Sequence, residues 1–337
     1  MFAEKKIHIR FAEAGDIPAL LTLLRTGLGE KVIPKTEAFW RWKHIENPFG
    51  PSLVLLAVDG NDIVGIRTFM QWRWRMGPRQ FQTVRGVDTV VDSRFQGHGL
   101  FGEMTMELFR YCEHLGIHFL FSTPNAKSKK GYRRLGWDQI GTLPINMRIV
   151  RPLAFATKFI FRRQKAGDHG MADRSIVSDY LNRPDFSLLI NASHSRQPGN
   201  AVTDHTPETL RWRYAAAPVG NYGACGIERE NRLRSVCFYR LKQTKAGLEL
   251  RIADIFMHNP SDGAELSRLL ARTVATHQVD YVTCSAFEQL EIFKSGFSLR
   301  NRKIGPSVTG RSVTLPDFNL FNKFSHWNPS LGDLELF

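Results

Sequence analysis

The stretch that decides the fold of this chain is Asp88–Met104, which reads DTVVDSRFQGHGLFGEM. It begins as a β-rich run, turns at Gly97 and Gly99, and continues with apolar residues at helical spacing. Glycines let a ligand approach the backbone without obstruction by a Cβ atom. The unpaired N–H groups of the first helical turn and the positive end of the helix dipole then attract an anion. The stretch therefore predicts a strand, a glycine turn and a helix that together bind a pyrophosphate.

Strands and helices alternate on both sides of this stretch. The turn residues Asp59-Gly60-Asn61-Asp62 between two β-rich runs indicate a hairpin. Asp16 suits the capping position of one helical pattern, and Thr36 and Glu37 begin a second. The order of elements describes an α/β fold (α+β) with a mixed sheet. In chain order we expect a strand at 7–10, helices beginning at 16 and 36, a hairpin with strands at 53–58 and from 63, a strand at 81–91, a helix at 100–115, a strand at 118–121, a helix at 126–135 and a strand from 137.

The bulk composition is that of a folded protein without a membrane span. Hydrophobic residues make up 42% and charged residues 23% of the chain, which excludes a wholly disordered protein. No apolar run follows the charged start MFAEKKIHIR, so we expect no signal peptide. The most apolar stretch, Pro152–Phe161, contains Lys158 and is much shorter than the roughly 20 residues that a spanning helix needs. We therefore expect a cytoplasmic protein without a transmembrane segment.

The cysteines and the net charge narrow the class of ligand. None of the cysteines belongs to a C-x-x-C pair, so we expect reduced thiols and no metal site. The formal net charge of +14 favours polyanionic partners such as CoA phosphates, nucleotide-sugars, nucleic acid or an anionic membrane face. The alternative is an arginine-rich surface that is merely solvated. Since no helix-turn-helix, zinc finger or aromatic RNA-binding signature is present, we expect no DNA partner.

The two halves of the sequence resemble each other. The stretch TEAFWRWKHIENP, which starts at Thr36, is similar to TPETLRWRYAAAP, which starts at Thr206. Two further stretches downstream match in the same order, which predicts an internal duplication. We expect a first domain at 1–150, a connection with the shortened start of a second copy at 151–205, and a degenerate copy at 206–337. The matched pairs are Trp42 with Trp212, Asp88 with Asp254, and Gly136 with Gly296.

The glycine turn also carries a family resemblance. Arg94-Phe95-Gln96-Gly97-His98-Gly99 fits Q/R-x-x-G-x-G/A, and so resembles the acyl-CoA-binding motif of the GNAT family of N-acyltransferases. The start IRFAEAGDIPALLTLL resembles the first strand and helix of that family, and PNAKSKKGYRRLGW (Pro124–Trp137) resembles its later Asn…Tyr…Gly-aromatic segment. The resemblance covers residues 5–150 closely and 200–300 loosely. It implies two tandem GNAT-like acyl-CoA acyltransferase domains.

The resemblance implies a site in the first copy. Pantetheine would lie beside the strand that precedes the glycine turn, with acetyl-CoA or another acyl-CoA as co-substrate. Tyr132 would protonate the leaving CoA thiolate. Asp88 is the candidate base, although its match at Asp254 favours a structural role. The residues that the resemblance assigns to acyl-CoA binding are Thr89, Val90, Val91, Arg94, Phe95, Gln96, Gly97, His98, Gly99, Leu100, Asn125 and Ser128.

The second copy lacks the features that would bind CoA. After Asp254 the chain reads IFMHNPSDGAELSRLL, which is shorter than the first turn and has one glycine. Asp262 and Glu265 stand where phosphates would lie, and their charges would repel a pyrophosphate. We expect that this copy does not bind CoA.

The implied activity is transfer of an acetyl or similar acyl group from CoA to a primary amine. The resemblance further suggests an amino-sugar or nucleotide-sugar of surface polysaccharide synthesis as the small-molecule acceptor. The helix and strand that border the acceptor site in such proteins carry Trp40, Trp42, Trp72 and Trp74, whose faces would suit a sugar ring, although we expect at least two of them to pack in the core. Two alternatives stay open: an aminoacyl-tRNA-dependent ligase with tandem GNAT folds, and a non-catalytic CoA-binding module that contacts a membrane surface through RPLAFATKFIFRRQK.

Overall fold

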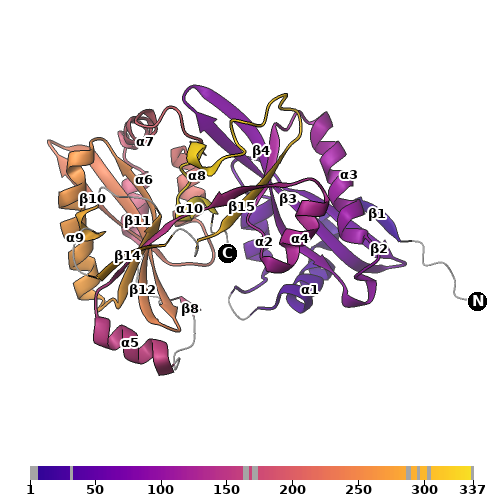
Figure 1. Ribbon diagram of the computed structural model, residues 1–337, viewed down its shortest axis with the longest axis horizontal. Coiled ribbons are helices and arrows are strands. Elements are labelled where there is room, and N and C mark those ends of the chain that lie inside the picture. Colours follow the sequence, from indigo (N-terminus) through magenta and orange to yellow (C-terminus); the bar gives the residue numbers. More distant parts are fainter. Residues whose placement is uncertain are drawn as a thin grey trace, which may run out of the picture. The chain divides into compact units, whose positions relative to one another are not determined.

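The computed structural model describes residues 7–30, 33–161, 167–168, 174–285, 290–293, 297–301 and 305–334. The chain forms two compact units, each built on one mixed sheet, which confirms the α/β prediction (Figure 1). The first unit consists of Met1–Trp74, Gln80–Gly141 and Ser307–Lys323. The second unit consists of Arg75–Arg79, Thr142–Pro306 and Phe324–Phe337.

The first unit has helices on both faces of its sheet. Its strands follow the order β1-β2-β3-β4-β5-β15-β6. One apolar cluster joins Leu20 and Leu24 to the sheet, and another joins Leu108 and Cys112 to it from α3. The elements are β1 (His8–Phe11), α1 (Ile17–Leu28), α2 (Glu37–His44), β2 (Leu53–Asp59), β3 (Asp62–Met76), β4 (Arg79–Val91), α3 (Leu100–His114), β5 (Phe119–Ser122), α4 (Ala126–Arg134), β6 (Asp138–Thr142) and β15 (Ser307–Ser312).

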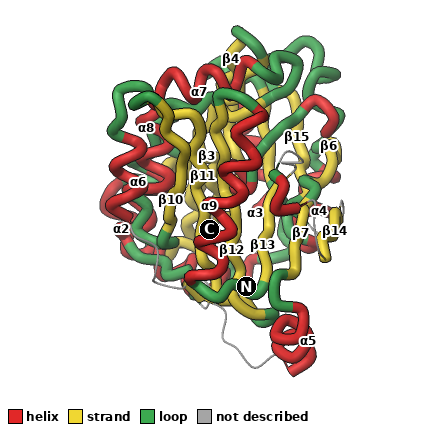
Figure 2. Tube along the Cα trace, turned by 90° about the vertical axis from the view of Figure 1, so that its left-hand side faces the viewer, coloured by secondary structure: helices red, strands yellow, loops and turns green. Residues whose placement is uncertain are grey.

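The second unit repeats this arrangement with the strand order β10-β11-β12-β13-β7-β14. Figure 2 shows α9 lying along one face of this sheet, where Leu266 and Leu270 join the core. Phe186 and Leu189 of α7 belong to a separate core cluster that also includes α6. The elements are β7 (Ile145–Ile149), α5 (Pro152–Phe161), β8 (Gly167–Asp168), α6 (Arg174–Leu181), α7 (Phe186–Ser195), β9 (Val202–Thr203), α8 (Pro207–Leu210), β10 (Tyr222–Arg229), β11 (Arg232–Thr244), β12 (Gly247–Met257), α9 (Gly263–Thr276), β13 (Tyr281–Ser285), β14 (Phe297–Asn301) and α10 (Leu331–Leu334).

One strand of each sheet comes from an unexpected part of the sequence. β7 follows β6 along the chain, yet it pairs with β13 and β14 in the second sheet. β15, near the C-terminus, pairs with β5 of the first sheet, with Thr309 opposite Ser122. The units therefore differ from the expected segments, because 307–323 belongs to the first unit and the second unit begins its main segment at Thr142. A period of two identifies a strand but not its partner.

The first two helices differ in how their N-termini are capped. Thr36 caps α2, since its side chain accepts a hydrogen bond from the N–H of Phe39 at 3.2 Å. Asp16 is the N-cap residue of α1, as predicted, but its side chain makes no capping hydrogen bond to that helix. Its carboxylate binds the Arg10 guanidinium at 2.7 Å and the N–H of Glu13 at 2.7 Å instead. A charged partner within reach competes successfully with a helix amide.

The C-terminal segment fills the space where β12 and β13 separate. These strands pair from Glu249 to Arg251, and beyond that point residues 328–334 lie against them. The N–H of Leu331 donates to Ser285 Oγ at 3.2 Å, and Arg213 Nε donates to the carbonyl of Gly332 at 3.1 Å. A cavity of about 80 Å³ lies beside Asp254 and Ser285, and a second of about 340 Å³ lies next to Leu331 and Glu249. Among the described residues, no helix has the length and apolar character to cross a membrane.

We predict that Gly332→Ala destabilises the second unit. A Cβ atom at this position would lie 2.6 Å from Asp254 Oδ2 and would also collide with the Tyr214 hydroxyl. Overpacking of this kind costs about 1–3 kcal/mol. Differential scanning calorimetry should show a lower transition temperature for this variant. Gly199→Ala is the matched control because nothing lies within 4 Å of its Cβ position. Equal transitions for the two variants would contradict the tight packing of this segment.

Candidate active site

The candidate site is a cleft where β4 and β5 separate in the first unit. These parallel strands pair only from Thr83 with Phe119 to Gly86 with Ser122. β5 ends at Ser122, whereas β4 continues to Val91. The gap is a cleft of about 520 Å³. The predicted site residues that line it are Asp88, Thr89, Val91, Gln96, Asn125, Ser128 and Tyr132.

The other predicted residues surround the cleft without lining it. The side chain of Val90 is buried with α1, so only its backbone could contact a ligand in the cleft. Phe95 and Leu100 are buried in the core and hold the glycine turn on the sheet. Arg94 is exposed and forms an ion pair with Asp92 at 2.8 Å. Gly97, His98 and Gly99 form the exposed turn between the strand and α3.

The glycine turn presents free amide groups. Gly97 has a φ of 87° and Gly99 a φ of 82°, in the left-handed region that glycine adopts without strain. No atom lies within 4 Å of a Cβ placed on either residue. Within the described part of the chain, no hydrogen-bond acceptor pairs with the N–H groups from Gly97 to Phe101. Because they stand at the N-terminus of α3, these amides are suited to binding an anion.

Tyr132 reaches the cleft from α4 and belongs to a buried polar cluster. Arg67 Nη2 donates to the Tyr132 phenol oxygen at 2.9 Å. The same guanidinium donates to Thr89 Oγ1 at 2.7 Å and to Thr105 Oγ1 at 2.9 Å. Ser122 lies 3.3 Å from the phenol oxygen. This cluster fixes the position of the phenol at the wall of the cleft.

Arg67 is an unusual group because its charge is not matched by a carboxylate. Its side chain is fully buried, and its hydrogen-bond partners among the described residues are all neutral hydroxyls. A buried cation without an anion is costly unless a negative charge comes close to it. The phenol oxygen of Tyr132 is the nearest group to the cleft that could take on such a charge. The sequence did not single out Arg67, because nothing local distinguishes it from other arginines.

Asn125 and Ser128 have a structural role at the start of α4. The N–H of Ser128 donates to Asn125 Oδ1 at 3.0 Å, and its hydroxyl also bonds to this oxygen, at 3.1 Å. Asn125 therefore caps the helix that carries Tyr132. Both residues line the cleft, so the predicted contact with pantetheine stays a prediction.

Asp88 lies at the cleft but is already paired with two buried residues of α2. Its Oδ2 lies 2.5 Å from Lys43 Nζ and 3.0 Å from His44 Nε2. Burial alone would raise the pKa of Asp88, but the Lys43 ammonium and the His44 hydrogen bond hold it well below its usual range. A carboxylate stabilised in this way is a weak base. The pairing supports the structural alternative and counts against the base role predicted from the sequence.

The equivalent contact recurs in the second unit. Tyr214 occupies the position that matches His44, and its hydroxyl bonds to Asp254, the match of Asp88. Lys43 and His44 were part of the matched stretch at Thr36, so the repeat was a signal that would have found them. Gly296, the third matched position, lies outside the described residues.

The acidic residues expected to repel a phosphate in the second unit are neutralised. Asp262 is buried and lies 3.6 Å from Arg229 and 3.8 Å from Arg234. Glu265 also pairs with Arg229, at 2.5 Å. The repulsion argument is therefore wrong, and the C-terminal segment is the physical obstacle to a ligand in this unit.

Two further sequence predictions concern metals and tryptophans. His205, Asp254 and Asp333 bring possible ligand atoms within 4.8 Å of one another, but His205 already pairs with Asp333 at 3.0 Å. The prediction of no metal site stays a prediction. All four tryptophans considered for the acceptor site are buried, which agrees with core packing and leaves no exposed ring face for a sugar. They are Trp40, Trp42, Trp72 and Trp74.

We predict that Asp88→Asn lowers stability in a manner that depends on pH. The variant leaves the Lys43 ammonium buried without its carboxylate, which costs about 3–5 kcal/mol. The native pKa of Asp88 is low. Its contribution to the free energy of unfolding is therefore complete above pH ~4, near the pKa of an unfolded Asp. The contribution fades as the pH falls below that value, because the unfolded chain then takes up a proton that the folded chain does not. Urea denaturation should show a gap between wild type and variant that narrows in acid. A gap that stays constant throughout would contradict the pairing.

Comparison with known proteins places the cleft in a family. Residues 8–140 match the family described as acetyltransferase (GNAT) domain. No curated protein sequence matches the chain. A GCN5-related N-acetyltransferase from Anabaena variabilis is 13% identical and superposes with a TM-score of 0.64, over 92% of this chain and 73% of its own.

Two other solved structures share the fold. An Enterococcus faecalis protein described as a probable N-acyltransferase is 12% identical, with a TM-score of 0.63 over 94% of this chain and 75% of its own. A GCN5-related N-acetyltransferase from Kribbella flavida is 12% identical, with a TM-score of 0.59 over 91% of this chain and 72% of its own. These likenesses show the fold, whereas the family match covers the segment with the cleft and the glycine turn. Residues 8–140 of this chain are therefore a domain of the GNAT acetyltransferase family.

Proposed function

We propose that this protein transfers an acyl group, most simply acetyl, from acyl-CoA to a primary amine. The observation that carries the proposal is the row of unpaired amides from Gly97 to Phe101 beside an open cleft. These amides suit the pyrophosphate of CoA, and the cleft beside β4 suits its pantetheine arm. The GNAT match of residues 8–140 supports the same donor.

The chemical step needs a proton for the departing thiol. The amine attacks the thioester carbonyl, the tetrahedral adduct collapses, and the carbon–sulfur bond breaks to release a CoA thiolate. Tyr132 lines the cleft and can give its phenol proton to that sulfur. The phenolate left behind lies 2.9 Å from the Arg67 guanidinium, which stabilises its negative charge. The proton lost by the amine passes to water in the cleft and finally restores the phenol.

Asp88 has a structural role rather than a proton-transfer role in this scheme. Its carboxylate lines the cleft, but it is neutralised by Lys43 and bonded to His44, so it holds β4 against α2. Direct abstraction of the amine proton by Asp88 is the less favoured form of the proposal, since Lys43 stabilises the charged carboxylate.

The acceptor proposed from the sequence is an amino-sugar or nucleotide-sugar. Burial of the four tryptophans removes the stacking surfaces that favoured a sugar, so this choice rests on the sequence resemblance alone. A tRNA-dependent ligase is the second candidate, favoured by the net charge of +14 and disfavoured by an open glycine turn suited to CoA. Cytoplasmic location also stays a prediction.

We further propose that the chain arose by duplication of one GNAT fold. The two sheets have corresponding strand orders, and the His44–Asp88 contact corresponds to the Tyr214–Asp254 contact. In this proposal only the first copy binds CoA, because the C-terminal segment lies in the equivalent gap of the second.

We predict that Gly97→Glu abolishes stabilisation by acetyl-CoA. A carboxylate in the turn would repel the pyrophosphate, so the stabilisation of about 2.7 kcal/mol expected at a hundredfold excess over Kd would be lost. Thermal-shift measurements with and without acetyl-CoA test this. Gly60→Glu is the control, because Gly60 also has a positive φ with open space around it but lies in the β2–β3 turn. Equal ligand shifts in wild type and Gly97→Glu would refute the donor site.

We predict that Tyr132→Phe lowers kcat about a hundredfold or more while sparing acetyl-CoA binding. Thiol release measured against a panel of primary amines tests this, with the exposed Tyr111→Phe as control.

If Arg67 acts through the phenolate, Arg67→Gln should lower kcat far less in the Tyr132→Phe background than in wild type. Additive losses would remove the proposed role of Arg67, and unchanged turnover in Tyr132→Phe would remove the acid.

A further inference from the structure

Helix α5 of the second unit presents apolar side chains to solvent along one side. Leu153 is 84% exposed and Ile160 is 71% exposed, and they stand two helical turns apart. Ala156 and Thr157 between them are also exposed, so the four residues form one stripe at helical spacing. Large apolar side chains aligned in this way are costly to keep in water and mark a contact surface.

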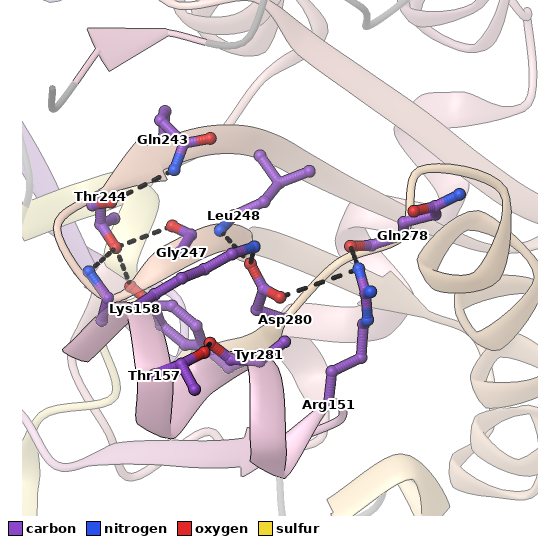
Figure 3. Close-up of polar contacts among 12 residues, drawn as sticks. Arg151, Thr157, Lys158, Gln243, Thr244, Gly247, Leu248, Gln278, Asp280 and Tyr281 are labelled. Carbon is purple, nitrogen blue, oxygen red and sulfur yellow. Dashed lines mark hydrogen bonds and ion pairs between the residues drawn. The ribbon is translucent and has the colours of Figure 1, made fainter. Parts of the chain in front are cut away.

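The helix is held on the second unit by its opposite side, so the stripe is fixed outward. Figure 3 shows Lys158 reaching the carboxylate of Asp280, which is fully buried, at 2.7 Å. The same carboxylate accepts a hydrogen bond from the N–H of Leu248 at 2.7 Å. Phe155 packs edge-on against Tyr281, with ring centroids 5.3 Å apart. These contacts use the inner residues of α5 and leave Leu153 and Ile160 free to meet a partner.

The charge around the stripe identifies the kind of partner. From Arg148 to Phe161, the described residues include the basic Arg148, Arg151 and Lys158 and no Asp or Glu. An apolar groove of about 530 Å³ lies at the start of α5, and both Arg148 and Arg151 line it. Arg151 Nη1 donates to the carbonyl of Gln278 at 3.1 Å, at the edge of this groove (Figure 3). A partner for this face must therefore be apolar and anionic together.

We propose that α5 docks this protein onto an anionic phospholipid membrane. The helix is too short to span a bilayer, but an apolar stripe with basic neighbours suits the boundary between headgroups and acyl chains. The guanidinium groups of Arg148 and Arg151 would meet lipid phosphates. A second copy of this chain is a poorer partner, because two like-charged faces would repel when brought together. The proposal does not depend on the acyltransferase reaction.

Vesicle co-sedimentation tests the proposal directly. The full chain should bind vesicles that contain phosphatidylglycerol, bind phosphatidylcholine vesicles weakly, and lose binding as salt is raised. The double variant Leu153→Asp, Ile160→Asp should lower the partition coefficient by at least about tenfold, because the two apolar side chains that would enter the bilayer are lost. Leu188→Asp is the matched control, since Leu188 is a 68% exposed leucine on α7 with no basic stretch around it.

Three outcomes would overturn the proposal. The first is equal partitioning of the double variant and the wild type, measured where both show the same thermal transition. The second is no binding of the wild type to phosphatidylglycerol vesicles. The third is a wild-type dimer in vesicle-free light scattering that the double variant abolishes, which would assign the stripe to a second copy of the chain. Acetyl-CoA thermal shifts in the same variant should stay as in wild type, so failure here leaves the proposed activity untouched.

Discussion

The separation of β4 from β5 beyond Gly86 and Ser122 is the constraint on which the candidate site depends. Two parallel neighbours normally continue their hydrogen bonds, but β5 ends while β4 runs on to the glycine turn. Gly86 stands at the branching point, where a Cβ atom would lie 2.5 Å from the Tyr132 phenol oxygen. The missing side chain lets Tyr132 and the buried Arg67 approach the wall of the gap. One local departure from regular pairing thus creates the cleft, places the Tyr132 phenol at its wall, and leads directly into the amides of α3.

The second unit shows how the same gap can be closed. There β12 and β13 also stop pairing before they end, but Leu331 and its neighbours fill the space and bond to Ser285 and Arg213. The buried carboxylates Asp88 and Asp254 occupy corresponding strands and bond to corresponding helical positions in both units. Their shared environment indicates that they fix the strand against the helix. Such a structural role is consistent with a carboxylate that occurs both beside an open cleft and beside a filled one.

Local chemistry explains which features could be predicted from the sequence. The glycine turn, the β2–β3 hairpin and the start of α2 depend on residues close together in the chain, and all were identified. The exchange of β7 and β15 between sheets depends on tertiary partners that periodicity does not encode. The pairing of Asp88 with Lys43 and the contact of Arg67 with Tyr132 each join residues that are far apart in the sequence. The sequence could not decide the role of the tryptophans, since an aromatic residue on an amphipathic element suits either a core or a ligand, and the structure places all four in the core.

We propose that each chain holds one open acyl-CoA site, formed by the first gap, while its own C-terminal segment occupies the second. Isothermal titration calorimetry with acetyl-CoA measures this most directly, because it counts binding sites per chain. The account predicts one site, with a favourable enthalpy from the charged hydrogen bonds to the α3 amides. A stoichiometry of two would show that the second gap is open to ligand, and the absence of binding heat at any concentration would contradict the assignment of the cleft.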